Sequence, residues 1–201
     1  TGPIIHYFPP LVNRYGSNFS KDFIIIMVAR FDPVKGHKEV LKVLKELVAE
    51  DKNVKLLLVG DGHLENEIKS QAAVSKLDGN IKFLGYRTDV PSLYSLADLA
   101  LLASYSESFP LVLLEAARER KPVVTTDVGG VRDLIPSNEY GWVVPVRDNE
   151  ALKKAIEEAI KLKEEKQLSS IGNKLYQRSS SLFTVGNFRD SVYAAYQKVL
   201  Y

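Results

Sequence analysis

Short apolar runs alternate with longer amphipathic segments along most of the chain. The apolar runs are rich in Val, Ile and Leu and carry little charge, which is typical of strands buried on both faces of a parallel sheet. We predict strands at residues 23–29, 54–59, 81–84, 99–106, 122–126 and 141–144. The remaining segments repeat apolar residues at helical spacing. They predict helices at 37–50, after Gly62 through about 75, at 90–97, after Ser108, and at 131–135, 149–166 and 185–200.

This regular alternation with short connections predicts an α/β fold, a doubly wound Rossmann-like parallel sheet with helices on both faces. Ligands of such sheets bind beyond the carboxyl ends of the strands. The candidate site residues all fall at such ends, and they are Arg30, Lys35, Gly60, Gly62, Arg87, Glu107 and Gly129. Residues 1–22 are irregular and contain Pro, Asn and Gly, so we interpret them as a lead-in that arrives from elsewhere.

Composition excludes several classes of protein. Of 201 residues, 45% are hydrophobic and 26% are charged, which is ordinary for a globular protein. The net charge of +2 is spread along the chain, without the clustered Lys and Arg of a nucleic-acid-binding face, so we expect no nucleic-acid partner. The absence of cysteine excludes disulfides and thiol catalysis. No apolar run reaches the ~18 residues that a membrane span requires.

The stretch Glu107–Glu115 follows an almost uncharged predicted strand and forms the centre of the predicted site. Ser108 can cap the next helix, and Pro110 suits its first turn. On one helix the two carboxylates would lie on the same side, about 12 Å apart. That span suits one elongated polar ligand better than a paired acid and base. Alternatively, Glu107 is an acid favoured at a helix start and Glu115 is a solvated helix position.

Arg30 and Lys35 form a basic pair on the loop after the first strand, together with Pro33 and Gly36. The planar fork of Arg and the point charge of Lys suit a pyrophosphate, although both could instead be solvated loop cations. The turn Ala29–Asp32 lacks the glycines of the dinucleotide fingerprint, and the chain has no P-loop. A nicotinamide or flavin dehydrogenase and an ATPase are therefore disfavoured.

Glycines at two strand ends leave the backbone accessible. Gly60 and Gly62 would let the chain come close to a ligand or to the next helix, and the Gly129–Gly130 pair leaves N–H groups open to phosphate oxygens. Turn geometry explains the first motif equally well. The three histidines are scattered, and no Asp-x-Asp pair occurs. We therefore predict no metal site.

Together these motifs resemble the nucleotide-sugar-binding half of group 1 glycosyltransferases, which have the GT-B fold. Each motif is weak alone, but their shared order over about residues 23–150 is specific. The matching motifs are Arg30 with Lys35-Gly36, Gly60-Asp-Gly62, Gly85-Tyr-Arg87, Glu107-Ser-Phe-Pro-Leu-Val-Leu-Leu-Glu-Ala116, Pro122-Val-Val124 and Asp127-Val-Gly-Gly130.

The resemblance implies a retaining transferase that moves a sugar from a nucleoside diphosphate donor, a UDP- or GDP-sugar, to an acceptor without a required metal or other cofactor. The implied catalytic residues are Arg30 and Lys35, which would neutralise the diphosphate, and Glu107, which would contact hydroxyls of the donor sugar. Glu115 would bind the ribose hydroxyls, and the backbone near Arg87 would meet the base. The full implied donor-binding set is Gly60, Gly62, Arg87, Ser108, Phe109, Pro110, Leu111, Glu115 and Gly129.

Two local departures distinguish the chain from the family pattern. Many members have glycine at the position of Pro110, and proline has no N–H to donate. One backbone contact to the donor would then be lost or shifted. The segment Arg118–Lys121 replaces the small residues and glycine that usually precede the Pro-Val-Val strand. We expect this second change to alter the end of the helix rather than the chemistry.

Length is a larger departure, because GT-B enzymes place the active site between two such domains. The resemblance implies that residues 1–22 link to a missing N-terminal domain, that 23–184 form the donor-binding domain, and that 185–201 form a C-terminal helix. The missing domain would bind the acceptor sugar, glycolipid or protein. We expect a cytoplasmic location, with peripheral association at the inner face of the membrane left open. We also expect this chain alone to bind the donor weakly or not at all and to show little turnover.

The resemblance favours a role in glycan or polysaccharide biosynthesis, and the sequence also fits two other functions. The chain could be a nucleotide-sugar-binding module without activity. It could also belong to a GT-B nucleotide-sugar epimerase or sugar-phosphate synthase, and product analysis would separate these from a transferase.

Overall fold

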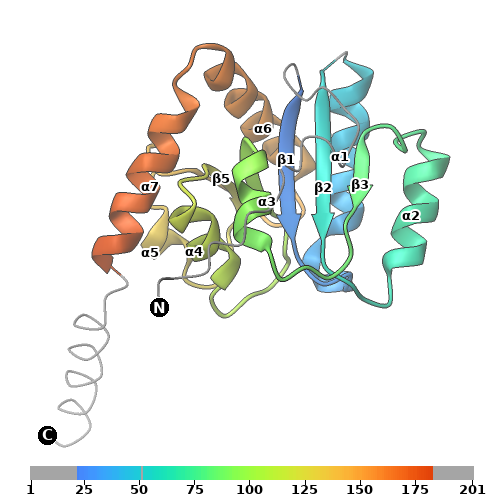
Figure 1. Cartoon of the computed structure of the whole chain (residues 1–201), viewed down its shortest axis with the longest axis horizontal. Helices are drawn as coiled ribbons and strands as arrows, with labels where there is room; N and C mark the ends of the chain where they lie inside the picture. Colours follow the sequence, from blue (N-terminus) through green and yellow to red (C-terminus); the bar gives the residue numbers. More distant parts are fainter. Residues whose placement is uncertain (1–21, 51, 183–201) are drawn as a thin grey trace, which may run out of the picture.

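The computed structural model describes residues 22–50 and 52–182 and shows a parallel sheet between two layers of helices (Figure 1). The strands are β1 Phe23–Val28, β2 Val54–Val59, β3 Ile81–Phe83, β4 Leu99–Leu102, β5 Val123–Thr126 and β6 Trp142–Val144. All neighbouring strands run parallel, in the order β3-β2-β1-β4-β5-β6. This is the order of a doubly wound Rossmann sheet, so the predicted fold class is confirmed.

Helices cover both faces of this sheet. The helices are a 3-10 turn η3 Pro33–Lys35, α1 His37–Ala49, α2 Glu65–Val74, α3 Val90–Leu96, α4 Leu111–Arg118, α5 Val131–Leu134, α6 Asn149–Glu164 and α7 Leu168–Leu182. Buried side chains of α1, α2 and α6 pack with Ile25 and Met27 of β1 on one face. Those of α3, α4, α5 and α7 pack with Ile24 and Ile26 on the other. Because successive side chains of a strand point to opposite faces, β1 must be apolar throughout.

Strand β4 is shorter than predicted, because it ends at Leu102 rather than near residue 106. The chain beyond Leu102 turns toward η3, where the backbone N–H of Tyr105 donates to the carbonyl of Val34 at 2.7 Å. This turn removes residues 103–106 from the sheet and directs them across its carboxyl edge.

The prediction that Ser108 caps the following helix is wrong. Helix α4 begins at Leu111, and Pro110 occupies the N-cap position in an extended conformation without a side-chain cap. The ring of a proline disfavours helical backbone at the residue before it, so the helix cannot extend back through Phe109. Glu107 therefore lies on the loop before α4 and not on the helix.

Helix α7 was not predicted. It contains several Ser residues, Gly172 and Asn173, all of which have low helix propensity. It forms because Leu175 is fully buried against the α4 layer and because Gly172 lets the helix approach the carbonyl of Arg120. A Cβ built at Gly172 would lie only 2.0 Å from that oxygen. The helix predicted at 185–200 lies outside the described residues.

We expect Gly172→Ala to destabilise the fold by about 2 kcal/mol, as overpacked contacts do. The new methyl group would collide with the Arg120 carbonyl, and this cost exceeds the helix propensity of about 1 kcal/mol that alanine gains over glycine. Urea unfolding followed by circular dichroism would measure the change. Gly79→Ala is the matched control, because no atom lies within 4 Å of a Cβ at Gly79. An equal loss in both variants would contradict the packing role of Gly172.

Candidate functional site

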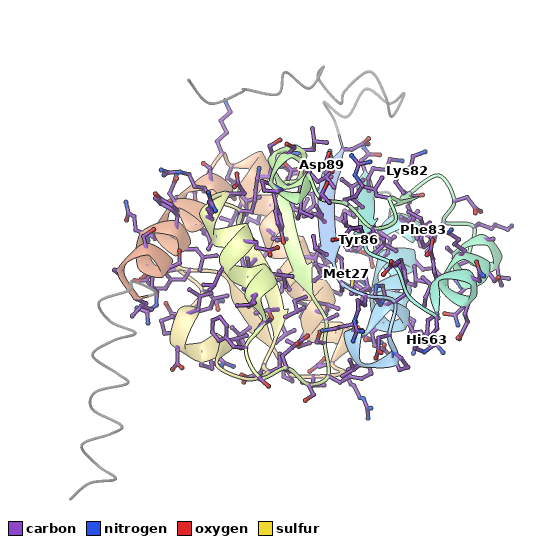
Figure 2. All side chains as sticks on the ribbon, turned by 60° about the horizontal axis from the view of Figure 1, so that its bottom comes forward. Met27, His63, Lys82, Phe83, Tyr86 and Asp89 are labelled. Atoms are coloured by element: carbon purple, nitrogen blue, oxygen red, sulfur yellow. The ribbon has the colours of Figure 1, made fainter. Side chains whose placement is uncertain are left out.

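The predicted site residues gather at the carboxyl edge of the sheet. The strand arrows point toward the lower edge of the molecule in Figure 1, and this edge is turned forward in Figure 2, where His63 marks the loop beyond β2. Strand order reverses between β1 and β4, which are neighbours in the sheet. Loops that leave these two strands diverge to opposite faces, so a crevice is expected between them.

Glycine at position 36 brings the loop after β1 against the loop after β4. The Asp32 side chain accepts from the Val34 N–H at 3.1 Å and caps η3, which ends at Gly36 with φ 72°. A Cβ at Gly36 would lie 2.1 Å from the carbonyl oxygen of Ala103. Any side chain here would both clash and adopt the disfavoured left-handed conformation.

This close approach joins Lys35 to Glu107, which are 72 residues apart. The Lys35 ammonium lies 2.5 Å from Glu107 Oε1, and both side chains are mostly buried, with 20% and 16% exposed. The Ser104 hydroxyl donates to the same carboxylate oxygen at 2.7 Å. Glu107 is thus fixed by a cation and a hydroxyl, and its predicted placement on one helix with Glu115 is corrected.

Tyr105 is a second link between these loops that the sequence analysis did not find. Its hydroxyl donates to Glu39 of α1, and the Arg147 guanidinium lies 4.6 Å from the ring centroid. Burial and the Glu39 carboxylate raise the pKa of the Tyr105 hydroxyl to about 12. The available sequence signal was that Ser104 and Tyr105 directly follow the apolar run of residues 99–103.

Arg30 begins the loop after β1 and is exposed, with no partner recorded for its guanidinium among the described residues. The loop itself is held by the turn after β2. A Cβ at Gly60 would lie 2.2 Å from the Ala29 carbonyl oxygen, and one at Gly62 would lie 2.6 Å from that of Phe31. The two glycines therefore let one loop pack on the other. Their contact with a ligand stays a prediction.

Gly129 lets the loop after β5 pack closely on the loop that precedes α4. A Cβ at this position would lie 2.3 Å from the carbonyl oxygen of Ser108, and Gly129 has φ 50°. The next residue, Gly130, lies against the Phe109 ring. The segment 107–109 is therefore held between the loops after β1 and β5. The amides of Leu111 and Val112 open helix α4 and have no intrahelical acceptor.

A pocket of about 450 Å³ brings Arg87 and Glu115 together between the loop after β3 and helix α4. Its lining residues are Tyr86, Arg87, Thr88, Val90, Pro91, Tyr94, Glu115, Arg118 and Glu119. Tyr86 is 73% exposed, so an aromatic face is available at the rim. Tyr94 donates its hydroxyl to the Val112 carbonyl at 3.2 Å and ties α3 to α4 beside the pocket.

Two carboxyl groups in or beside this pocket have shifted pKa values of opposite sign. Partial desolvation raises the pKa of Glu115. By contrast, Arg87 donates to both oxygens of Asp89, at 2.7 and 2.6 Å, and these bonds hold the pKa of Asp89 below its usual value. The Arg87 guanidinium is turned to Asp89. Glu115 is thus the carboxylate positioned to accept hydrogen bonds from a ligand.

His37 is buried beneath the loop that carries the basic pair. Its ring stacks on Phe31 with centroids 4.5 Å apart, and its Nδ1 has no hydrogen-bond partner among the described residues. Burial, with the nearby Lys35 charge, lowers the pKa of His37 to about 4. His37 therefore packs in the core beneath this loop.

The carboxyl edge thus offers cations, carboxylates and the first amides of α4, a combination that suits an anionic ligand with hydroxyl groups. No group of three or more His, Asp or Glu side chains within 22–50 and 52–182 could hold a metal ion. None of the helices in the same ranges is long and apolar enough to cross a membrane.

Fold and site together define a Rossmann-like α/β domain whose carboxyl edge carries charged side chains of both signs. The family model described as "Glycosyl transferases group 1" matches residues 13–178, so the chain belongs to this family. N-acetyl-alpha-D-glucosaminyl L-malate synthase from Bacillus anthracis is 34% identical over 158 residues, covering 79% of this chain and 40% of that protein. Putative glycosyltransferase EpsD from Bacillus subtilis (strain 168) is 27% identical, covering 87% and 46%. The chain spans less than half of these two relatives.

Solved structures show the same fold. Anabaena Alr3699/HepE in complex with UDP superposes with a TM-score of 0.81 at 24% identity, covering 94% of this chain and 51% of that one. The C-terminal domain of the group 1 protein LpcC from Francisella tularensis has a TM-score of 0.73 at 20% identity, covering 81% and 87%. The resemblance to group 1 glycosyltransferases of the GT-B fold is thereby confirmed, whereas the role of each site residue stays a prediction.

We expect the stability of the chain to fall as pH decreases from 6.5 toward 4. The unfolded chain protonates His37 near its ordinary pKa of 6.5, whereas the folded chain resists protonation until about 4. Above pH 6.5 His37 is neutral in both states, and the folded chain has its full stability. Protonation of the unfolded chain below that pH lowers the free energy of unfolding by about 3 kcal/mol, at ~1.4 kcal/mol per pKa unit. Urea unfolding at a series of pH values would measure it.

His37→Phe keeps a ring on Phe31 and removes the titration, so its stability should depend less steeply on pH over this range. His63→Gln is the control, because His63 is exposed and its replacement should leave the slope unchanged. A wild-type slope retained by His37→Phe would contradict the assignment.

Proposed function

We propose that this chain is the donor-binding domain of a retaining glycosyltransferase, which transfers a sugar from a nucleoside diphosphate sugar to an acceptor. The observation that carries the proposal is the partly buried contact between Lys35 and Glu107 at the strand-order reversal, in a chain of the group 1 family. A cation and a carboxylate side by side suit the junction of a diphosphate and a sugar, because one group binds phosphate oxygens and the other accepts from hydroxyls.

In this proposal the diphosphate lies beside Arg30, Lys35 and the first amides of α4. When the bond from the sugar to the diphosphate breaks, negative charge develops on the leaving phosphate oxygen. The two cations stabilise that charge, so no metal is required. The acceptor hydroxyl attacks the same face of the sugar, and its proton passes to the leaving phosphate.

The rest of the donor extends toward the pocket of Arg87 and Glu115. Glu115 accepts from the two ribose hydroxyls, and its raised pKa reflects a partly dry site where such bonds are strong. Glu115 lies four residues beyond Leu111, which is about 6 Å along the axis of α4. The base lies near the Arg87 backbone and the exposed Tyr86 ring. Because Pro110 has no N–H, the first donors of α4 are Leu111 and Val112.

Relatives support this assignment by what they bind or act on. Anabaena Alr3699/HepE forms complexes with UDP and UDP-glucose, which favours a uridine donor here. A relative from Campylobacter jejuni, 31% identical over 145 residues, is an alpha-1,4-N-acetyl-D-galactosaminyltransferase named for an undecaprenol-linked acceptor. An acceptor bound by a second domain, at the inner face of a membrane, fits this pattern. The match to an isolated C-terminal domain supports residues 23–184 as the donor half.

We expect calorimetric titration of the chain with UDP, GDP and ADP to show weak, saturable binding of one nucleotide. Arg30→Ala and Glu115→Ala should each weaken it by about tenfold, the loss of roughly 1.4 kcal/mol that one charge-assisted hydrogen bond contributes. Lys154→Ala is the control, because Lys154 is exposed on α6 and its loss should change nothing. Equal binding by wild type and both site variants would overturn the assigned positions.

We further expect Glu107→Gln to separate sugar binding from nucleotide binding. The substitution releases Lys35 from its ion pair, so affinity for the free nucleoside diphosphate should be kept or improved. Affinity for the sugar conjugate should fall relative to the free nucleotide, because the carboxylate that accepts from sugar hydroxyls is gone. The ratio of the two dissociation constants measures this effect, and a ratio equal to that of wild type would contradict the role of Glu107.

A further inference from the structure

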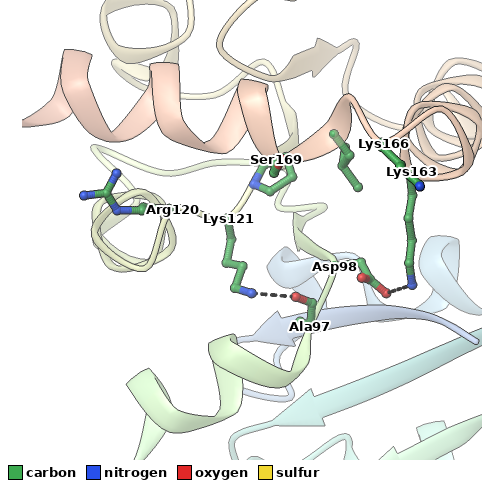
Figure 3. Close-up of a pocket in the computed structure, with 9 residues that line it drawn as sticks. Ala97, Asp98, Arg120, Lys121, Lys163, Lys166 and Ser169 are labelled. Carbon is green, nitrogen blue, oxygen red and sulfur yellow. Dashed lines mark hydrogen bonds and ion pairs between the residues drawn. The ribbon is translucent and has the colours of Figure 1, made fainter. Parts of the chain in front are cut away.

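A second pocket lies at the opposite edge of the sheet, beyond the amino ends of β4 and β5 (Figure 3). It has a volume of about 270 Å³ and lies where the connections α3–β4, α4–β5 and α6–α7 meet. We call it the basic pocket and define it by the residues Asp98, Arg120, Lys121, Lys163, Lys166 and Ser169. None of these residues belongs to the proposed donor site.

Positive charge is in large excess in the basic pocket. Four cationic side chains and one carboxylate line it, so the lining has three more cations than carboxylates. Asp98 already accepts from Lys163 at 2.7 Å and from the Ile24 N–H at 2.8 Å. Burial lowers the pKa of Lys121 despite the opposing effects of the Asp98 and Glu119 carboxylates. A bound anion would relieve both the repulsion between like charges and the cost of desolvation.

The two inner lysines are held in place with donors to spare. Lys121 donates to the Ala97 carbonyl at 2.8 Å, and Lys163 donates to Asp98, as the dashed lines in Figure 3 show. Lys163 also reaches the Asp22 carbonyl at 2.9 Å, and Lys121 lies 3.4 Å from the Ser95 carbonyl. An ammonium group has three N–H donors, so these bonds leave one donor on each lysine. The Lys163 ammonium also lies 5.6 Å from the centroid of the Phe23 ring.

Arg120 forms one wall of the pocket. Its guanidinium stacks over the Tyr176 ring at 4.1 Å and donates to Asn173 at 3.0 Å. Figure 3 shows it turned away from the lysines. Arg120 therefore adds to the positive potential without contacting the centre of the pocket.

Lys166, on the connection between α6 and α7, and Ser169, at the start of α7, complete the pocket. No partner is recorded for the Lys166 ammonium among the described residues. Ser169 lies in the first turn of α7, a helix of 15 residues, where backbone amides lack intrahelical acceptors and the helix dipole is positive. The hydroxyl and the amides add neutral donors to those of the lysines.

We propose that the basic pocket binds a phosphate dianion, either inorganic phosphate or the terminal group of a phosphomonoester. The dianion matches the excess of cationic side chains in the lining of the basic pocket. Its oxygens can accept from lysine N–H groups and from the hydroxyl and amides at the start of α7. The ligand is either a soluble phosphate or the phosphomonoester headgroup of a lipid.

Lys166→Gly tests the proposal without endangering the fold. Lys166 follows α6 with φ 60°, a left-handed conformation that glycine adopts without strain. The variant should be at least as stable as wild type, yet bind phosphate about tenfold more weakly, as the loss of one charge-assisted hydrogen bond predicts. Lys166→Arg should retain binding. Lys76→Gly is the matched control, because Lys76 has φ 58° after α2 and lies outside the pocket.

The measurement is the melting temperature as phosphate replaces chloride at constant ionic strength, since a ligand of the folded state raises it with concentration. Wild type, Lys76→Gly and Lys166→Arg should be stabilised by phosphate, and Lys166→Gly much less. Arg30→Ala should respond like wild type, which separates this pocket from the donor site. A phosphate effect that is absent in wild type, equal in both glycine variants, or lost in Arg30→Ala would overturn the proposal.

Vesicles then identify the source of the phosphate. Co-sedimentation with phosphatidylcholine vesicles that contain phosphatidic acid, but not with phosphatidylcholine alone, and its loss in Lys166→Gly, would support a lipid headgroup. Stabilisation by free phosphate without sedimentation would support a soluble phosphate.

Discussion

The contact of Gly36 with the carbonyl of Ala103 is the constraint on which the carboxyl edge depends. No side chain fits at this position, where a Cβ would lie 2.1 Å from the oxygen. The contact fixes the loop after β1 against the chain that leaves β4, on the two sides of the strand-order reversal. It brings Lys35 within 2.5 Å of Glu107, and the bond from the Tyr105 N–H to Val34 strengthens the same junction. The two loops are therefore arranged before any ligand binds, which reduces the ordering cost of binding.

The two edges of the sheet carry different kinds of charge. At the carboxyl edge, Lys35 is paired with Glu107, and Glu115 adds a second carboxylate in a neighbouring pocket. Mixed charge of this kind suits a ligand that combines phosphates with hydroxyl groups. At the amino edge, the basic pocket has one carboxylate for four cations, which suits a ligand that is mainly anionic. One fold thus presents two chemically distinct surfaces on opposite ends of the same strands.

Most of the fold could be predicted because its strands are buried on both faces. Exposing a continuous apolar run to water is unfavourable, so such runs indicated each strand of the sheet. The spacing of apolar residues then predicted most of the helices between the strands. The failures occurred where local rules competed with packing. Helix α7 contains Gly172, which lowers its intrinsic propensity but permits contact with Arg120. Ser108 has the chemistry of a helix cap, but the extended Pro110 moves the helix start to Leu111.

The sequence by itself determined the chemical types at the site, namely Arg30 and Lys35 after the first strand and Glu107 and Glu115 around the start of α4. Only the tertiary structure decided their partners. It paired Lys35 with Glu107, and it placed Glu115 with Arg87 in a separate pocket. It also gathered the basic pocket from three connections that no motif links. The physical reason is that composition and periodicity record which residues leave water, whereas the contacts between loops depend on backbone approaches of a few ångströms across distant parts of the chain.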